Sequence, residues 1–181
     1  MSEPTKIEAS ETPALDDAVN ESIRQYNKAS RRARLSSIVL EKVDFHILPD
    51  ALRISRAELR RELSVETDLF HFDSDDGDCI ASIGWAIILS DKQKEVASCK
   101  ADYLVFYHDL KGFSEDIIKL FIECAGKAAT YAYFRALYAQ LDWSASLGSP
   151  PLPVMSFIMN PKDLRSYVRN EAVSKGSAAP S

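Results

Sequence analysis

Apolar residues recur with two different periods along the chain, and these periods predict separate helices and strands. From Leu15 to about Arg34 they recur every three or four positions, as on one face of an amphipathic helix. The segment Ile38–Leu48 alternates in two registers, which predicts a strand with a bulge. A basic connection from Arg53 to Arg61, compatible with a helix, leads to the alternation from Leu63 to Leu69 that is typical of a half-buried strand.

Two further alternating segments predict a β-hairpin in the middle of the chain. Cys79–Leu89 is apolar at every odd position, and Ala97–Tyr107 repeats that pattern after a polar turn. Setting both apolar faces on the same side of the sheet pairs odd positions with odd positions. The hairpin therefore places Trp85 opposite Cys99 or Ala101.

The last third of the chain is predicted to be helical and then to stop at prolines. Ser114 offers a hydroxyl that can cap a helix start, and Gly126 can divide the segment into a short and a long helix. The long helix carries an aromatic stripe that can pack against a sheet or another helix. The stripe consists of Tyr131, Phe134, Tyr138 and Leu141. Gly148 and the proline-rich segment Pro150–Val154 end it, and Asn160-Pro161 begins a terminal helix.

These elements predict a single α+β domain. With 181 residues the chain is long enough for one hydrophobic core. We expect the domain to span residues 15–173, between polar tails at residues 1–14 and 174–181.

The charge balance argues against nucleic acid and membranes as partners. The net charge is −5, so general attraction to phosphate groups is absent, and the basic clusters at Arg31–Arg34 and Arg53–Arg61 are interpreted as solvated faces. The chain contains no run of 18 or more apolar residues, the length that can cross a bilayer. Its first residues are acidic, where a signal peptide would be basic. We expect a cytoplasmic protein without membrane insertion.

No residue pattern predicts a catalytic site, a metal site or a cofactor. Cys79, Cys99 and Cys124 lack CxxC spacing, and the first two lie about 20 Å apart along the predicted ladder. The acidic turn Asp73–Asp78 misses the spacing of a calcium loop, and no nucleotide-binding loop is present. The protein is therefore not expected to be an enzyme, although a site built from distant residues would not be visible in the sequence.

Aromatic residues exceed what one layer of helix on sheet must bury. Core is the expected place for each of them taken singly. Their sum also allows an oligomer interface or a groove for an extended apolar chain.

The order of the predicted elements resembles that of the SecB export chaperones. The likeness runs over about residues 34–170. It is strongest from Tyr131 to Phe157, where a helix with Tyr131-Ala132 and Arg135 is followed by the linker Pro150–Val154. The additional helix that runs into Arg31–Leu35 resembles the SecB-like chaperones of toxin–antitoxin systems.

This resemblance implies a fold, an assembly and a function. The fold is a four-stranded antiparallel sheet with helices packed on one face, plus the additional N-terminal helix. The assembly is a homotetramer, a dimer of dimers. The function is ATP-independent chaperone binding of unfolded or extended polypeptide in grooves between sheet and linker, for protein export or for protection of an antitoxin. The family's translocase ATPase is a possible partner, although the tail Ser174–Ser177 lacks the acidic residues of the export members.

Two sets of site residues follow from this reasoning. The first set is expected to bind clients and comprises Trp85, Tyr103, Val105, Pro151, Leu152 and Val154. The second set is expected to form the oligomer interface and comprises Tyr131, Phe134, Tyr138 and Leu141.

Two alternatives remain open at this stage. The protein could be a non-chaperone interaction or regulatory protein, such as a toxin–antitoxin partner, in which the stripe serves only assembly. It could also be a small-ligand domain or enzyme with a pocket between helix and sheet. A closed polar pocket would favour the latter, and an open apolar groove would count against it.

Overall fold

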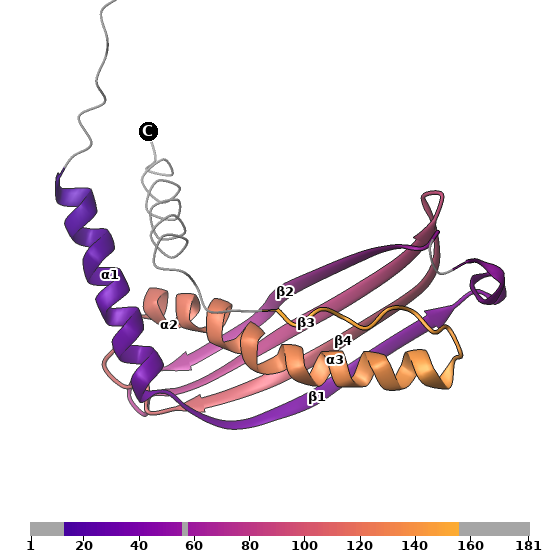
Figure 1. Ribbon diagram of the computed structural model, residues 1–181. Helices are drawn as coiled ribbons and strands as arrows, with labels where there is room; N and C mark the ends of the chain where they lie inside the picture. The colour runs from indigo at the N-terminus through magenta and orange to yellow at the C-terminus, as the bar shows by residue number, and fades with distance from the viewer. Residues whose placement is uncertain (1–12, 56–57, 156–181) are drawn as a thin grey trace, which may run out of the picture.

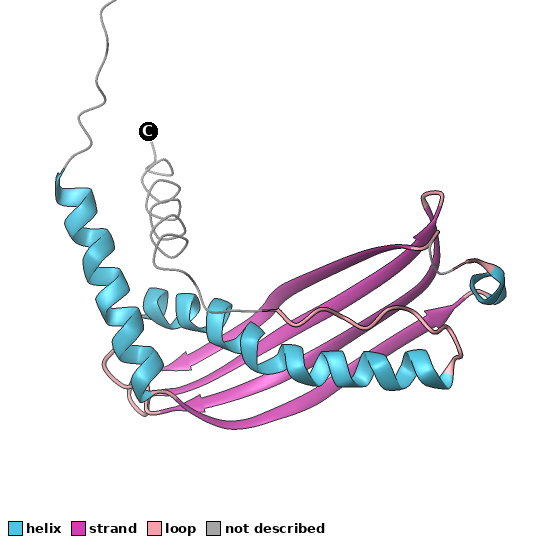
Figure 2. Ribbon diagram, in the orientation of Figure 1, coloured by secondary structure: helices cyan, strands magenta, loops and turns pink. Residues whose placement is uncertain are grey.

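A computed structural model describes residues 13–55 and 58–155 and shows one antiparallel sheet with helices on one of its faces (Figures 1 and 2). The four strands are β1 (Arg34–Ile47), β2 (Arg60–Asp73), β3 (Asp78–Asp91) and β4 (Lys94–His108), in the spatial order β1-β4-β3-β2. The predicted α+β fold class with a four-stranded antiparallel sheet is confirmed.

The strand register of the hairpin pairs odd positions with odd positions, as the sequence predicts. Trp85 pairs with Ala101 across the β3–β4 ladder, one of the two partners that the sequence allowed. Cys79 pairs with Tyr107, eight residues beyond Cys99, so these two cysteines lie far apart. The β1–β4 register shifts between Leu40 and Lys42, which confirms the predicted bulge.

The basic connection between the first two strands differs from the prediction. A short 3₁₀-helix, η1 (Pro49–Arg53), ends at Arg53, where the helical connection was expected to begin, and the described residues from Ile54 to Arg61 are not helical. Pro49 occupies its first position, where a fixed φ and a missing N–H cost nothing. The helical turn therefore begins at Pro49, two residues after the end of β1.

One almost continuous helical rod covers the sheet. It consists of α2 (Glu115–Phe121), the π-helical turn η2 (Ile122–Gly126) and α3 (Lys127–Ser144). Gly126 therefore divides the rod by a wider turn and not by a break. A Cβ atom at Gly126 would lie 3.3 Å from Cδ1 of Ile83, so glycine allows the rod to approach β3 closely at this point.

The predicted cap at Ser114 is only partly correct. Ser114 is the N-cap residue of α2 and has extended backbone dihedral angles, but its side chain makes no capping hydrogen bond. Its carbonyl oxygen instead accepts a hydrogen bond from the N–H of Ile118 at 3.1 Å. Glu115 and Asp116 in the first turn still complement the positive end of the helix dipole.

The additional N-terminal helix is confirmed as α1 (Pro13–Arg32). It packs against α2 and extends beyond the sheet (Figure 1). Ile23 and Tyr26 contact a small cluster formed by Leu120 and Cys124 on the rod. Pro13 and Ala14 thus belong to the helix and not to the predicted tail. The rest of that tail, the tail at 174–181 and the helix predicted from Asn160-Pro161 lie outside the described residues.

The acidic turn between β2 and β3 is held by backbone hydrogen bonds. The Asp73 carboxylate accepts hydrogen bonds from the N–H groups of Asp75 and Asp76, and these bonds lower its pKa. Gly77 has φ of +79° and donates its N–H to the carbonyl oxygen of Asp73. Its own carbonyl accepts from Leu110 at 3.0 Å, so this turn lies directly against the loop after β4.

The cysteines are buried and unpaired with one another. Burial raises the pKa of the Cys79 thiol to about 12 and that of Cys99 to about 11, so both are neutral thiols at physiological pH. In residues 13–55 and 58–155, no three side chains of the metal-binding types gather into a group. Within the same ranges, no helix has the length and apolar character needed to cross a membrane.

Candidate functional site

Three of the six predicted client-binding residues belong to the core. Trp85, Tyr103 and Val105 lie on the inner face of the sheet beneath the helical rod and are at most 3% exposed. The indole N–H of Trp85 donates to Oγ1 of Thr130 on α3 at 2.9 Å. These side chains are thus covered by the chain itself, and in this arrangement a client cannot reach them.

The aromatic stripe of α3 also faces the sheet. Phe134 is fully buried, stacks on Trp85 with ring centroids 5.8 Å apart, and contacts Tyr138 at 6.4 Å. Tyr131 contacts Trp85 at 5.0 Å, and Leu141 packs against the same core. The predicted oligomer role therefore does not fit the position of the stripe, because intrachain packing already occupies it. The sheet, one of the two partners left open for the stripe, is the one it contacts.

The segment after α3 runs back beside the helix as an extended linker (Figure 1). We call residues 149–155 the linker. One guanidinium nitrogen of Arg61 on β2 donates to the carbonyl oxygens of Pro150 and Pro151, at 2.6 and 3.3 Å. The Tyr131 hydroxyl donates to the carbonyl oxygen of Pro153 at 2.7 Å. The linker is therefore fastened both to the edge strand β2 and to α3.

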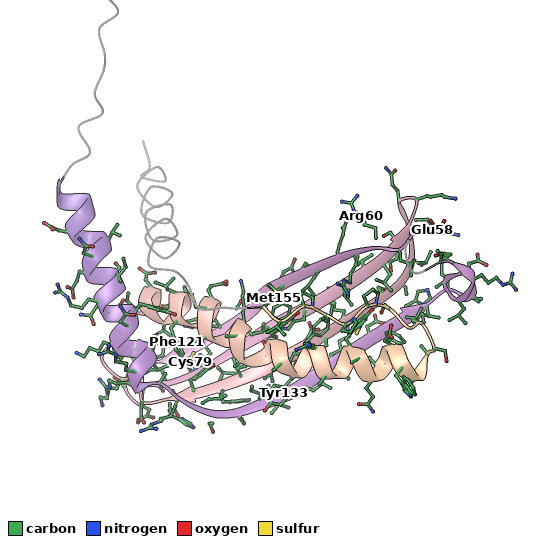
Figure 3. All side chains as sticks on the ribbon, in the orientation of Figure 1. Glu58, Arg60, Cys79, Phe121, Tyr133 and Met155 are labelled. Atoms are coloured by element: carbon green, nitrogen blue, oxygen red, sulfur yellow. The ribbon has the colours of Figure 1, made fainter. Side chains whose placement is uncertain are left out.

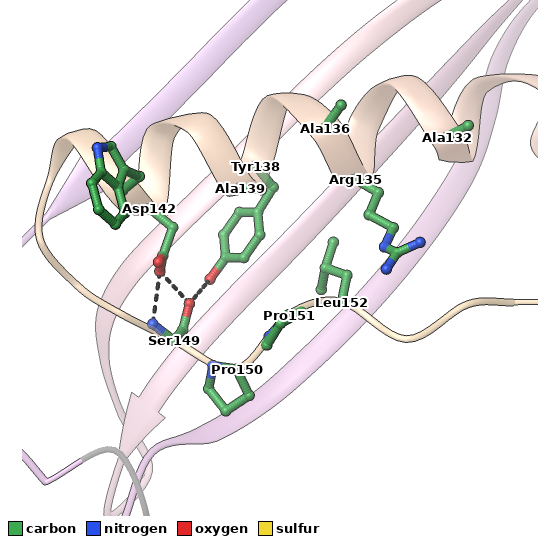
Figure 4. Close-up of a pocket in the computed structure, with 11 residues that line it drawn as sticks. Ala132, Arg135, Ala136, Tyr138, Ala139, Asp142, Ser149, Pro150, Pro151 and Leu152 are labelled. Atoms are coloured by element: carbon green, nitrogen blue, oxygen red, sulfur yellow. Dashed lines mark hydrogen bonds between the residues drawn. The ribbon is translucent and has the colours of Figure 1, made fainter.

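The start of the linker is held by a small polar cluster. The Asp142 carboxylate accepts hydrogen bonds from the Ser149 N–H at 3.0 Å and from the Ser149 hydroxyl. The Ser149 hydroxyl also meets the Tyr138 hydroxyl at 2.7 Å (Figure 4). Leu152, only 3% exposed, inserts into the core next to this cluster.

An open apolar groove of about 450 Å³ lies between α3 and the linker (Figure 4). We call it the linker groove. Three alanines form part of its helical wall, and Trp143, 84% exposed, is the last residue of α3 that lines it. The residues that line it are Ala132, Arg135, Ala136, Tyr138, Ala139, Asp142, Trp143, Ser149, Pro150, Pro151 and Leu152.

Only part of this site was predicted from the sequence. Pro151 and Leu152 line the linker groove, whereas Val154 is exposed beyond its lining residues. The groove lies between helix and linker, and not between sheet and linker as the family resemblance implied. The helical wall was missed, although its signal is present: Ala132, Ala136 and Ala139 recur at steps of four and three beside the aromatic stripe.

Charge in the groove is mainly positive where it is accessible. Asp142 is only 8% exposed and its carboxylate is turned to Ser149, whereas Arg135 is half-buried in the groove wall. Burial raises the pKa of Tyr131, and the positive charges of Arg135 and Arg61 act in the opposite direction. Both cations therefore lie within electrostatic reach of the same phenol beside the linker.

The linker groove has the lining of a binding cleft. Ser149 is the one serine among the lining residues that the structure describes, and its hydroxyl is engaged by Asp142 and Tyr138. Asp142 is the one carboxylate among the described lining residues, and it is buried against Ser149. Apolar walls with few polar groups favour a ligand with apolar side chains.

Comparison with known proteins supports the fold. No protein-family model and no curated protein matches the chain. A solved structure from Mycobacterium tuberculosis, the SecB-like chaperone Rv1957 in complex with a ChAD peptide from the Rv1956 HigA1 antitoxin, matches with a TM-score of 0.59. The match is 18% identical and covers 76% of this chain and 99% of that chain. A protein of unknown function from Streptococcus agalactiae matches with a TM-score of 0.36, 10% identity and coverage of 68% and 97%.

The chain therefore has a SecB-like fold, with α1 as its additional N-terminal helix. At 18% identity the likeness extends to the fold alone.

Proposed function

We propose that this protein is an ATP-independent chaperone that binds unfolded or extended polypeptide in the linker groove. The observation that carries the proposal is the open apolar groove beside α3, with a volume of about 450 Å³ and the exposed Trp143 among its lining residues. This volume is in the range of ligand-binding clefts and can hold apolar side chains of an extended chain. The SecB-like fold supports the proposal, because Rv1957 has this fold and is described as a chaperone in complex with an antitoxin peptide.

The chemistry of the linker determines how a client is recognised. Pro150, Pro151 and Pro153 have no backbone N–H, and their carbonyl oxygens already accept hydrogen bonds from Arg61 and Tyr131. This part of the linker cannot form a β-ladder with a client. We therefore propose that the groove recognises apolar side chains, and that it does so in the cytoplasm for an antitoxin or another client.

Filling the groove tests this function. Ala136→Gln places a longer neutral side chain on the exposed wall without touching the core, and glutamine is a good helix former. We expect it to weaken binding of a labelled apolar peptide by about tenfold or more, since burying one apolar side chain contributes about 1.5–3 kcal/mol. Fluorescence anisotropy with the peptide, and light scattering of an aggregating unfolded protein, measure the effect.

Ala128→Gln is the matched control. Ala128 lies on the same helix, is exposed and does not line the groove, so this variant should bind like the wild type. A wild-type protein that neither suppresses aggregation nor binds apolar peptides would contradict the proposal. Assembly without client binding would support the alternative of a purely structural or regulatory interaction protein.

We further propose that the protein assembles as a homotetramer, and the exposed edge strand β1 supports this. β1 lies at the edge of the sheet and presents Leu35, Val39, Leu40 and Val43, each 37–47% exposed. A long apolar edge strand is a template for pairing with another chain. Pairing of two copies along β1 would cover this surface while leaving the linker groove as a separate site.

A charge on this edge is expected to reduce the oligomeric state. Leu40→Lys should convert the tetramer into smaller species, because lysine on an edge strand opposes strand pairing. Mass measurement in solution checks this result. Leu52→Lys, the same substitution at an exposed leucine of η1, should leave the mass unchanged. A monomeric wild type, or a tetrameric Leu40→Lys variant, would exclude this assembly.

A further inference from the structure

The linker groove contains a cation whose charge no side chain in the wall balances. Arg135 projects from α3 toward the linker, beside Leu152 (Figure 4). Among the described residues that line the groove, Arg135 is the only arginine or lysine and Asp142 the only acid. Among the side chains that the structure describes, no carboxylate lies within ion-pair distance of Arg135.

The one acid of the groove is occupied elsewhere. The Asp142 carboxylate accepts two hydrogen bonds from Ser149 at the start of the linker, and it is buried. Arg135 and Asp142 are seven residues apart on α3, about two turns, so they are not at the spacing of a helical ion pair. The groove therefore offers a positive group to an incoming chain and almost no accessible negative one.

A second cation strengthens this field. Arg61 on β2 donates hydrogen bonds to two carbonyl oxygens of the linker. These oxygens are neutral, so the guanidinium group keeps its full positive charge beside the groove. Two positive groups next to apolar walls favour an anionic group in the occupant, because a half-buried charge is screened less by solvent than an exposed one. A cationic occupant would instead meet repulsion from both.

From this arrangement we infer that the linker groove selects extended peptide segments in which a carboxylate, from aspartate or glutamate, neighbours an apolar residue. The inference rests on the proposed chaperone function and adds a substrate class to the same site. The apolar residue occupies the space between the alanine wall and Leu152, in the groove that Trp143 also lines. The carboxylate, one or two residues away along the client, pairs with the guanidinium group of Arg135. Segments with lysine or arginine at that position are disfavoured.

Three labelled peptides of identical length test this preference. Each contains the same central Leu-Phe pair, flanked by glutamates in the first peptide, by glutamines in the second and by lysines in the third. For the wild-type protein we expect the glutamate peptide to bind about threefold tighter than the glutamine peptide, and the lysine peptide about threefold weaker. The resulting difference of about tenfold between the charged peptides should shrink as salt is added.

Variants assign the preference to one residue. In Arg135→Gln the ratio of the two charged peptides should fall toward unity, whereas Arg135→Lys should retain part of it. Arg24→Gln is the matched control. Arg24 lies on α1, is paired with Glu21 and does not line the groove, so its removal should leave the ratio intact.

Each outcome has a definite meaning. Equal binding of all three peptides, or tighter binding of the lysine peptide, would overturn the inference while the proposed function stands. A preference for glutamate that survives in Arg135→Gln would also overturn it, because the selecting group would then be elsewhere. Failure of even the glutamine peptide to bind would remove the proposed function itself.

Discussion

Replacing Phe134 by alanine is expected to lower the free energy of unfolding by about 3–5 kcal/mol. Phe134 is fully buried at the centre of α3, where its ring stacks on Trp85 and contacts Tyr138. Its removal would leave a cavity between helix and sheet that the surrounding rings cannot fill. Urea unfolding followed by far-ultraviolet circular dichroism measures the loss.

The neighbouring position provides the control. Tyr133 is one residue away on the same helix but is 56% exposed and lies on its flank (Figure 3). Tyr133→Ala should change the unfolding free energy by less than about 1 kcal/mol, as is usual for surface substitutions. Similar losses for the two variants would mean that α3 does not face the sheet with its aromatic stripe.

Gly77→Ala is expected to cost about 2–5 kcal/mol, for a backbone reason. Its positive φ alone costs alanine about 1–2 kcal/mol. In addition, a Cβ atom at this position would lie 2.3 Å from the backbone nitrogen of Lys111, so the turn or the loop after β4 would have to move. The midpoint of urea unfolding compared with that of the wild type measures the effect.

Gly112→Ala separates these two contributions. Gly112 also has a positive φ, of +84°, but no described atom outside Gly112 and its two chain neighbours lies within 4 Å of the Cβ position. This variant should therefore lose only about 1–2 kcal/mol, the cost of the left-handed conformation. Equal losses at Gly77 and Gly112 would show that the loop after β4 moves away without cost.

The strands and helices could be predicted because they depend on local periodicity. Odd-to-odd parity limited the partner of Trp85 to Cys99 or Ala101, since a shift of one residue would have turned every apolar side chain of β3 to the wrong face, and the structure pairs it with Ala101. The 3₁₀-helix at Pro49–Arg53 was misplaced because the basic residues that follow it suggested a longer helix. The π-helical turn was not predicted, because a single glycine in a helical pattern indicates a break as readily as a change of winding.

The candidate site was predicted only where prolines interrupt the helical periodicity of the sequence. The proline run identified Pro151 and Leu152, because it ends the helix and leaves an extended segment beside it. The burial of Trp85 and Tyr103 was not predicted, because parity determines which face a side chain occupies but not which element covers that face. The alanine wall was overlooked because alanine is common both in cores and on surfaces, and only the returning linker makes this row one side of a groove.

The π-helical turn η2 determines the rotational phase of α3. Buried residues recur at every fourth position along the rod: Ile118, Ile122, Gly126, Thr130, Phe134 and Tyr138. In a straight α-helix each step of four overshoots a full turn by about 40°, so this row would rotate away from the sheet over five steps. The wider turn winds less per residue and takes back part of that rotation. Its phase keeps the aromatic row over the sheet and, for the same reason, points Arg135 toward the linker (Figure 4).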